Sequence, residues 1–110
     1  MNRYLKQIGD KKYRLRVSDE DIIKRRTMFD LGSVGDFEMT ALIFEIDEDG
    51  YLMRQIVLEG IYLYRGKERK DILNVNIDGN ELPDIHIDDI IEGRWTAGEI
   101  ANLPWDEFQI

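Results

Sequence analysis

The Asp49-Gly50 pair, set between two apolar-rich runs, is the feature that most restricts how this chain folds. Asp-Gly is a favoured pair for a two-residue hairpin turn, because both turn positions need a positive φ. The flanking runs, 37–48 and 51–58, carry the alternating apolar residues that are typical of paired strands. The sequence therefore predicts a β-hairpin over residues 37–58.

The register of this hairpin follows from a two-residue loop, which makes Glu48 and Tyr51 the first opposed pair. The next pairs outward are Ile46–Met53, Glu45–Arg54, Phe44–Gln55 and Ile43–Ile56. The opposite charges of Glu45 and Arg54 support this register by about 0.2–1 kcal/mol. One face of the hairpin then carries Leu42, Phe44 and Ile46, and the other carries Ala41, Ile43, Ile56 and Leu58. Bulky residues on both faces predict a central place in the sheet.

Four more runs have the alternation or the length of short strands: residues 3–8, 12–17, 61–64 and 72–77. Gly9-Asp10 forms a turn between the first two runs. Asp78-Gly79 offers a second hairpin turn into a return strand at Glu81-Leu82. Pro83 has no N–H for a ladder, so that return strand lies at an edge or ends there.

A helix is predicted to begin after Ser18, which can cap it. Acidic residues fill its first turn, where the helix dipole favours negative charge. The apolar face of this helix is narrow, with Ile22, Ile23, Met28 and Phe29, and Gly32 ends it. A charged loop is the alternative.

The tail is expected to hold a short helix over 88–92, capped by Asp88, and a last helical turn over 103–108 with Pro104 at its first position. Four apolar residues should pack this tail on the sheet: Trp95, Ile100, Trp105 and Phe108. The predicted class is α+β, with a mainly antiparallel β-sheet and one or two short helices in a single domain, 1–110.

The net charge of −8 is spread unevenly along the chain. Residues 1–31 carry a net charge of +4, residues 32–70 carry −3 and residues 71–110 carry −9. An acidic surface repels phosphate backbones, so we expect no direct binding of nucleic acid. The same surface attracts a basic protein and accelerates its association. A purely solubilising role for the acidic segment is the alternative.

The chain contains no cysteine, which suits a reducing compartment and removes disulfides and thiolate chemistry. The first residues show no apolar core of a signal peptide. The longest apolar runs are far shorter than the roughly 20 residues that a spanning helix needs. We therefore expect a soluble, cytoplasmic protein that does not act at a membrane.

The residues needed for common hydrolytic chemistry are sparse. His86 is the only histidine and alternates with Ile85 and Ile87, so a surface or helix-capping role is the simpler interpretation. Ser18 and Ser33 lie in no nucleophile motif. The run 47–50 resembles the start of a calcium loop, but positions six and twelve are leucines, so a hairpin turn explains it better. We expect no enzymatic activity and no cofactor or metal.

The acidic cluster Asp84, Asp88, Asp89 and Glu92 is the candidate site for binding a partner. Helical spacing places Asp88 or Asp89 on one face with Glu92. Trp95 follows directly, and tryptophan is a frequent anchor of protein interfaces. A solvated face, or a site for Mg²⁺ or paired carboxylates, are the alternatives. A basic N-terminal face with Lys11, Lys12, Arg14 and Arg16 is a second possible interface.

From Phe44 onward the chain resembles small acidic bacterial immunity proteins of contact-dependent growth inhibition and other polymorphic toxin systems. The resemblance is carried by the hairpin 45–56, by Leu82-Pro83-Asp84-Ile85, by Glu99-Ile100 and by Trp105-Asp106-Glu107-Phe108. It covers about 65 residues and assigns no functional residue. It implies a cytoplasmic protein that binds and blocks a basic toxin, typically a nuclease domain.

Two other functions stay open at this point. The chain could be a phage- or host-encoded inhibitor of another nucleic-acid enzyme, which would use its acids to mimic phosphate. It could also be a small interaction module of another role. The sequence determines neither the identity of the partner nor the oligomeric state.

Overall fold

The computed structural model describes residues 2–19, 21, 28–30, 36–65, 68–79, 82–103, 105 and 107–109. Its strands are β1 (Leu5–Gly9), β2 (Lys12–Arg16), β3 (Met28–Asp30), β4 (Asp36–Glu38), β5 (Ala41–Ile46), β6 (Leu52–Arg65), β7 (Glu68–Asp78) and β8 (Glu107–Gln109). Its helices are α2 (Ile87–Ile91) and α3 (Ala97–Ala101). None of the helices in these ranges is long and apolar enough to cross a bilayer.

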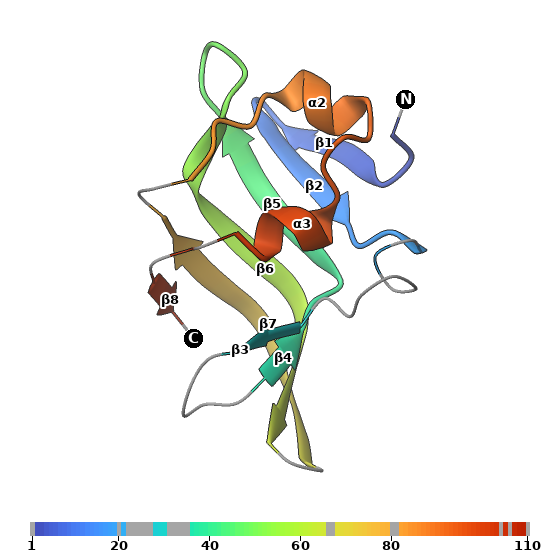
Figure 1. Ribbon diagram of the computed structural model, residues 1–110, viewed down its shortest axis with the longest axis vertical. Coiled ribbons are helices and arrows are strands. Elements are labelled where there is room, and N and C mark those ends of the chain that lie inside the picture. The colour runs from blue at the N-terminus through green and yellow to red at the C-terminus, as the bar shows by residue number, and fades with distance from the viewer. Residues whose placement is uncertain are drawn as a thin grey trace.

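All eight strands join one antiparallel sheet, as Figure 1 shows. The order β1-β2-β5-β6 continues into β7 and then β8. The long strand β6 has β7 along one edge, while its other edge pairs first with β5 and then with β4. This arrangement confirms the predicted class, a mainly antiparallel sheet with short helices. The strands expected at 3–8 and 12–17 are present as β1 and β2.

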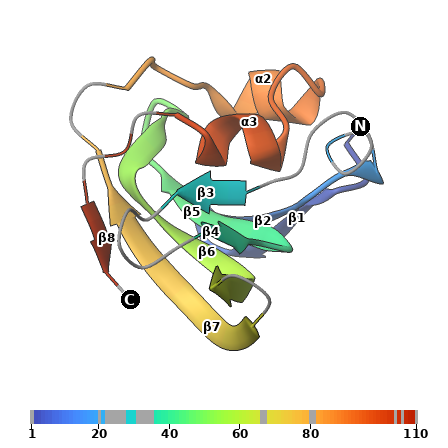
Figure 2. The same ribbon diagram turned by 60° about the horizontal axis from the view of Figure 1, so that its bottom comes forward.

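The core lies between the sheet and the two helices, which cover the same face of the sheet (Figure 2). The central strands contribute Leu42, Phe44, Ile56, Leu58, Val75 and Ile77, and each is at most 2% exposed. The tail contributes Ile85, Ile90, Ile100 and Trp105. Ile100 and Trp105 therefore pack the tail on the sheet as predicted, and the Trp105 Nε1–H donates to the Ile100 carbonyl at 2.9 Å.

The hairpin around Asp49-Gly50 exists, but its predicted register is wrong. Ile46 pairs with Leu52, and Phe44 pairs with Ile56 instead of Gln55. The connection is longer than two residues because the Asp47 carboxylate organises it. Asp47 Oδ1 accepts hydrogen bonds from the backbone N–H groups of Asp49 and Tyr51, both at 2.9 Å. A side chain that bonds the backbone two residues later replaces the tight turn.

This correction changes which residues share a face of the hairpin. Ile56 and Leu58 point into the core with Phe44 and Leu42, not to the opposite face. The longer loop moves the register by one residue at Ile46–Leu52, which reverses the side chains of the strand. An irregularity between Phe44 and Ile46 then shifts the register by two residues, which leaves the faces reversed. Glu45 is consequently not the partner of Arg54, which pairs with Asp84 at 3.3 Å.

The helix predicted after Ser18 is confirmed only at its start. Asp19 and Asp21 are helical, and the Asp21 N–H donates to Ser18 Oγ at 3.1 Å. Met28 and Phe29, assigned to its apolar face, lie instead in β3, where they pair with β4. Ile22, Ile23 and Gly32 lie outside the described residues. β-Branched and aromatic neighbours favour a strand, and pairing to β4 determines the outcome at 28–30.

The tail departs from its prediction at three points. The short helix α2 has His86 at its N-cap, not Asp88. Leu82 belongs to no strand, and Glu81 lies outside the described residues. Residues 107–109 form β8, which pairs with β7, so the predicted helical turn over 103–108 is wrong there. Antiparallel pairing with the open edge of β7 outweighs the weak helix signal of Pro104.

Candidate protein-binding surface

The loop 47–51 is a rigid turn that its own aspartate holds in place. Besides the two bonds to Asp47 Oδ1, the Asp47 N–H donates to the Tyr51 carbonyl at 2.8 Å and the Gly50 N–H donates to the Asp47 carbonyl at 3.1 Å. The acidic run that resembles the start of a calcium loop thus uses its first carboxylate for backbone bonding. Glu48 and Asp49 remain exposed at the tip of the loop.

His86 fastens this loop to helix α2. Its Nε2 lies 2.9 Å from the Asp49 carbonyl, and its Nδ1 accepts the Asp88 N–H at 3.1 Å. These two bonds fit the neutral imidazole with its proton on Nε2, because Nδ1 must act as an acceptor. The ring of Tyr51 meets the imidazole edge-on, with centroids 4.9 Å apart. The capping role predicted for His86 is confirmed.

Gly50 makes this close contact possible. Its φ is +90°, and a Cβ added to it would lie 2.6 Å from His86 Nε2. The Gly50 carbonyl accepts the Ile87 N–H at 2.8 Å, and the Leu52 N–H donates to the Ile85 carbonyl at 2.8 Å. The loop and the first turn of α2 therefore form one unit, although they are more than 30 residues apart in sequence.

We expect His86→Ala to lower the free energy of unfolding by about 1–2 kcal/mol, because it removes a helix cap and a bond to the loop. His86→Asn should recover roughly half of this loss, since asparagine caps a helix well but does not reach the loop. Urea unfolding followed by circular dichroism measures both variants. Equal losses for the two variants would mean that the cap contributes nothing.

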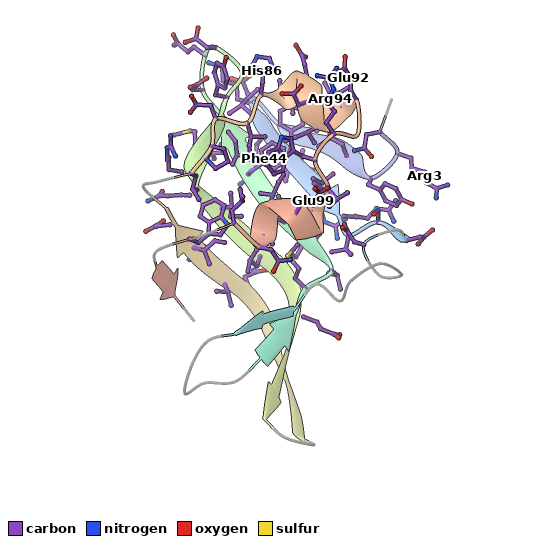
Figure 3. All side chains as sticks on the ribbon, viewed as in Figure 1. Arg3, Phe44, His86, Glu92, Arg94 and Glu99 are labelled. Atoms are coloured by element: carbon purple, nitrogen blue, oxygen red, sulfur yellow. The ribbon has the colours of Figure 1, made fainter. Side chains whose placement is uncertain are left out.

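The acids of the predicted site are partly neutralised within the chain. Asp84 pairs with Arg54 at 3.3 Å, and Arg94 contacts both Asp89, at 2.8 Å, and Glu92, at 2.9 Å. Asp88 lies 3.4 Å from His86 Nδ1. The side chains of Asp84 and Asp88 are still 79% and 75% exposed, so both remain available to a partner. Figure 3 shows Arg94 and Glu92 beside each other at α2.

Trp95 lies apart from Asp84 and Asp88. It is half-buried and packs against the core. It lines a groove of about 320 Å³ together with Arg3, Tyr4 and Arg16. This groove places Trp95 beside one of the predicted acids, Glu92, and Arg3 and Arg16 make its lining mixed in charge.

Sequence reasoning missed that the loop 47–51 joins the acids of 84–92. We call the combined surface the acidic end; its acids are Asp47, Glu48, Asp49, Asp84, Asp88, Asp89 and Glu92, and its cations are Arg54 and Arg94. Seven carboxylates and two guanidinium groups give this surface a net charge of −5 with His86 neutral. The acidic run 47–49 was the signal that could have revealed it.

Two large apolar side chains are exposed at the acidic end. Tyr51 is 41% exposed and Met53 is 46% exposed. They line a shallow groove of about 510 Å³, whose rim includes Asp47, Arg54 and Asp84. Tyrosine, methionine and arginine are enriched in protein interfaces, and a groove with an acidic rim suits a basic segment of a partner.

Comparisons with protein-family models, with curated proteins and with solved structures gave no match to this chain. The interpretation of the acidic end therefore rests on its own geometry and charge.

Proposed function

We propose that this chain is an immunity or inhibitor protein, acting in the cytoplasm, that binds and neutralises a basic protein toxin. The observation that carries the proposal is the acidic end, where exposed acids surround the exposed Tyr51 and Met53. A nuclease domain is the toxin class that fits best, because its phosphate-binding surface is basic and is blocked by a surface that bears carboxylates in place of phosphates.

Binding rather than catalysis is supported by how the candidate catalytic groups are used. Both ring nitrogens of His86, the only histidine, bond backbone groups of the loop and of α2. The Ser18 hydroxyl accepts the Asp21 N–H. A general base needs a free nitrogen within reach of the proton that it removes, and His86 presents none in this arrangement.

The arrangement of the acidic end suggests how binding would proceed. Exposed acids attract a basic partner and raise the association rate. Tyr51 is already oriented by His86, so little conformational entropy is lost when a partner covers it. Asp89 and Glu92, which share Arg94, contribute less than Asp84 and Asp88. Trp95 is the weakest member of the proposed interface because the core already holds it.

The proposed function is tested with any nuclease domain that is found to be encoded next to this chain and that carries a basic surface. Co-expression should restore growth to cells that produce the nuclease, and the purified chain should form a stoichiometric complex that no longer cleaves DNA or RNA. A complex with a different nucleic-acid enzyme would favour the inhibitor alternative. A chain that neither binds nor protects against any adjacent nuclease would contradict the proposal.

Removing two acids of the acidic end should weaken the complex. Asp84→Ala combined with Asp88→Ala is expected to reduce affinity at least tenfold, or about 1.4 kcal/mol, mainly through slower association that loses its salt dependence. Asp19→Ala combined with Glu45→Ala removes the same charge from exposed positions outside the acidic end and is the control. Surface plasmon resonance at two salt concentrations measures both. Equal affinity of the two double variants would reject this site.

A further inference from the structure

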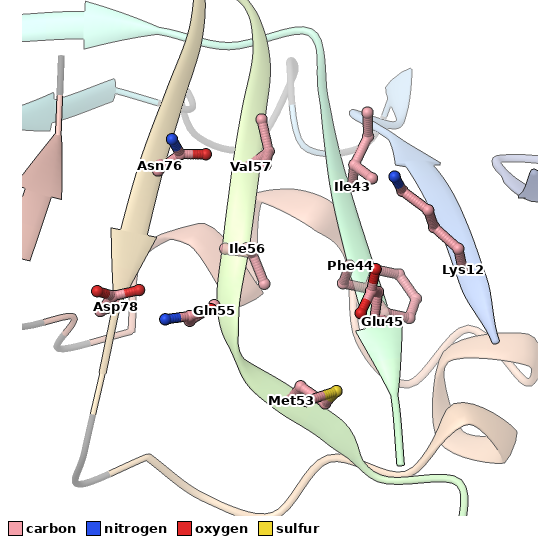
Figure 4. A pocket seen from close by; sticks show the side chains of 10 residues that line it. All are labelled: Lys12, Ile43, Phe44, Glu45, Met53, Gln55, Ile56, Val57, Asn76 and Asp78. Atoms are coloured by element: carbon pink, nitrogen blue, oxygen red, sulfur yellow. The ribbon is translucent and has the colours of Figure 1, made fainter. Parts of the chain in front are cut away.

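The face of the sheet opposite the helices forms a second surface, which we call the outer face. Its central part, shown from close by in Figure 4, is made by alternate residues of four adjacent strands. These are Lys12, Arg14 and Arg16 on β2, Ile43 and Glu45 on β5, Gln55, Val57 and Glu59 on β6, and Asn74, Asn76 and Asp78 on β7. Arg16 lies at the margin of this face, because its side chain also lines the groove beside Trp95. The residues between them point into the core.

The central part of the outer face is electrically neutral, whereas the chain as a whole is acidic. Three cations on β2 are balanced by Glu45, Glu59 and Asp78, whereas the whole chain carries −8. Arg14 and Glu59 already pair within the chain at 2.7 Å. A second copy approaching any strongly acidic surface would be repelled, so the outer face is where two copies can meet without that cost.

The positive and negative charges of this face lie on different strands: the cations are on β2 and the acids are on β5, β6 and β7. Lys12 pairs across the strands with Glu45 on β5, and Asp78 pairs with Gln55 on β6. Three strand spacings, about 14 Å, separate β2 from β7. Within the described part of the chain, neither Lys12 nor Asp78 has an ion pair. Between them Ile43 opposes Val57, both half-buried, beside the 46%-exposed Met53.

We propose that the outer face is a self-complementary interface between two copies of this chain. A two-fold axis parallel to the strands, between β5 and β6, places β2 of one copy against β7 of the other. Lys12 then faces the partner's Asp78, and Ile43 faces the partner's Val57, each contact occurring twice. Aligned face-to-face packing of this kind is common for twisted antiparallel sheets.

A two-fold axis perpendicular to the strands is the other way to pack two outer faces together. Repulsion between like charges excludes this arrangement. It would place β2 of one copy against β2 of the other, so that Lys12 would face the partner's Arg16 and Arg14 would face the partner's Arg14. Like charges in direct opposition are destabilising. The distribution of charge therefore favours a second copy of this chain as the partner, and it favours the two-fold axis parallel to the strands.

The test uses a pair of charge reversals, Lys12→Glu and Asp78→Lys, measured by sedimentation velocity from micromolar to millimolar concentration in the absence of any toxin. The wild-type chain is expected to dimerise. Each variant alone should raise the dimer dissociation constant at least tenfold, because each homodimer would contain two like-charge contacts. An equimolar mixture of the two variants should dimerise again, since the mixed dimer contains one native pair, Lys12 with Asp78, and one pair in which both signs are reversed.

Arg3→Glu is the matched control, because it changes the charge by the same amount at an exposed position outside the outer face and should dimerise like the wild type. Circular dichroism verifies that every variant is folded. A wild-type chain that stays monomeric at all concentrations overturns the proposal. Variants that dimerise as well as the wild type, or a mixture that fails to recover, overturn it too. None of these outcomes depends on the proposed function.

Discussion

Gly60→Ala should destabilise the protein by about 2–6 kcal/mol, the largest effect expected for a single added methyl group. Gly60 has a φ of +67°, where an L-residue is strained by about 1–3 kcal/mol. A Cβ at this position would also overlap Thr40 Oγ1, and relieving such an overlap typically costs about 1–3 kcal/mol more.

The overlap is hard to relieve because two hydrogen bonds hold Thr40 in place. Its N–H and its hydroxyl both donate to the Glu59 carbonyl, each at 3.0 Å. This is also the point where the edge of β6 changes its partner from β5 to β4, since Ala41 pairs with Glu59 and Glu38 pairs with Tyr62. A shift of the backbone here would disturb two strand pairs at once.

Gly93→Ala is the control for this prediction. Gly93 has a φ of +80°, but nothing lies within 4 Å of an added Cβ, so only the backbone strain remains. The expected cost is that strain alone, about 1–3 kcal/mol. Combining Gly60→Ala with Thr40→Ala should recover part of the loss, because the overlap with Oγ1 disappears while the backbone strain and a close contact with the Cβ at position 40 persist. Equal unfolding midpoints in urea for the two alanine variants would show that the contact with Thr40 is unimportant.

Asp21→Ala is expected to lower the free energy of unfolding by about 3 kcal/mol. Asp21 is only 4% exposed. Its carboxylate accepts the Thr96 hydroxyl at 2.6 Å, the Gly98 N–H at 3.3 Å and the Ser18 N–H at 3.4 Å. Hydrogen bonds to a charged group contribute about 1.5–3 kcal/mol each, and the cost of burying the carboxylate offsets part of that sum.

Two further variants separate the loss of these Asp21 hydrogen bonds from the general effect of losing an acid. Asp19→Ala removes an exposed carboxylate two residues earlier and should change stability by no more than about 0.5 kcal/mol. Asp21→Asn keeps one acceptor oxygen, and the Thr96 hydroxyl can rotate to accept from the new amide, so it should cost less than half as much as Asp21→Ala. Thermal and urea unfolding both report these differences. An Asp21→Ala variant as stable as Asp19→Ala would show that the hydrogen bonds of Asp21 do not stabilise the fold.

The parts of the fold that could be predicted from sequence are those set by local pattern. The alternation at 12–17 and the Asp-Gly pair identified β2 and the hairpin correctly. The register could not be obtained in this way, because the Asp47 carboxylate competes with the tight turn for the backbone of the loop. Residues 28–30 were assigned to a helix because their pairing with β4 is not visible in local sequence.

The candidate site was predicted less well than the fold, for a related reason. The exposure of Asp84 and Asp88 could be expected from their charge. The ion pair of Asp84 with Arg54 depends on a contact between distant segments, as does the groove that Trp95 and Glu92 line together with Arg3 and Arg16. A pattern of residue types shows which side chains are charged, but not which opposite charge the fold brings beside them.

The His86 bond to the loop has a consequence for the order in which this chain acquires its structure. A nascent chain that ends before His86 contains the loop 47–51 but neither His86 nor Asp88, so the acidic end is incomplete on the ribosome. Contacts between distant segments form late, because a long loop must be closed before they contribute. We therefore expect the acidic end to form only after residues beyond α2 have left the exit tunnel, so that a chain truncated before His86 would lack it.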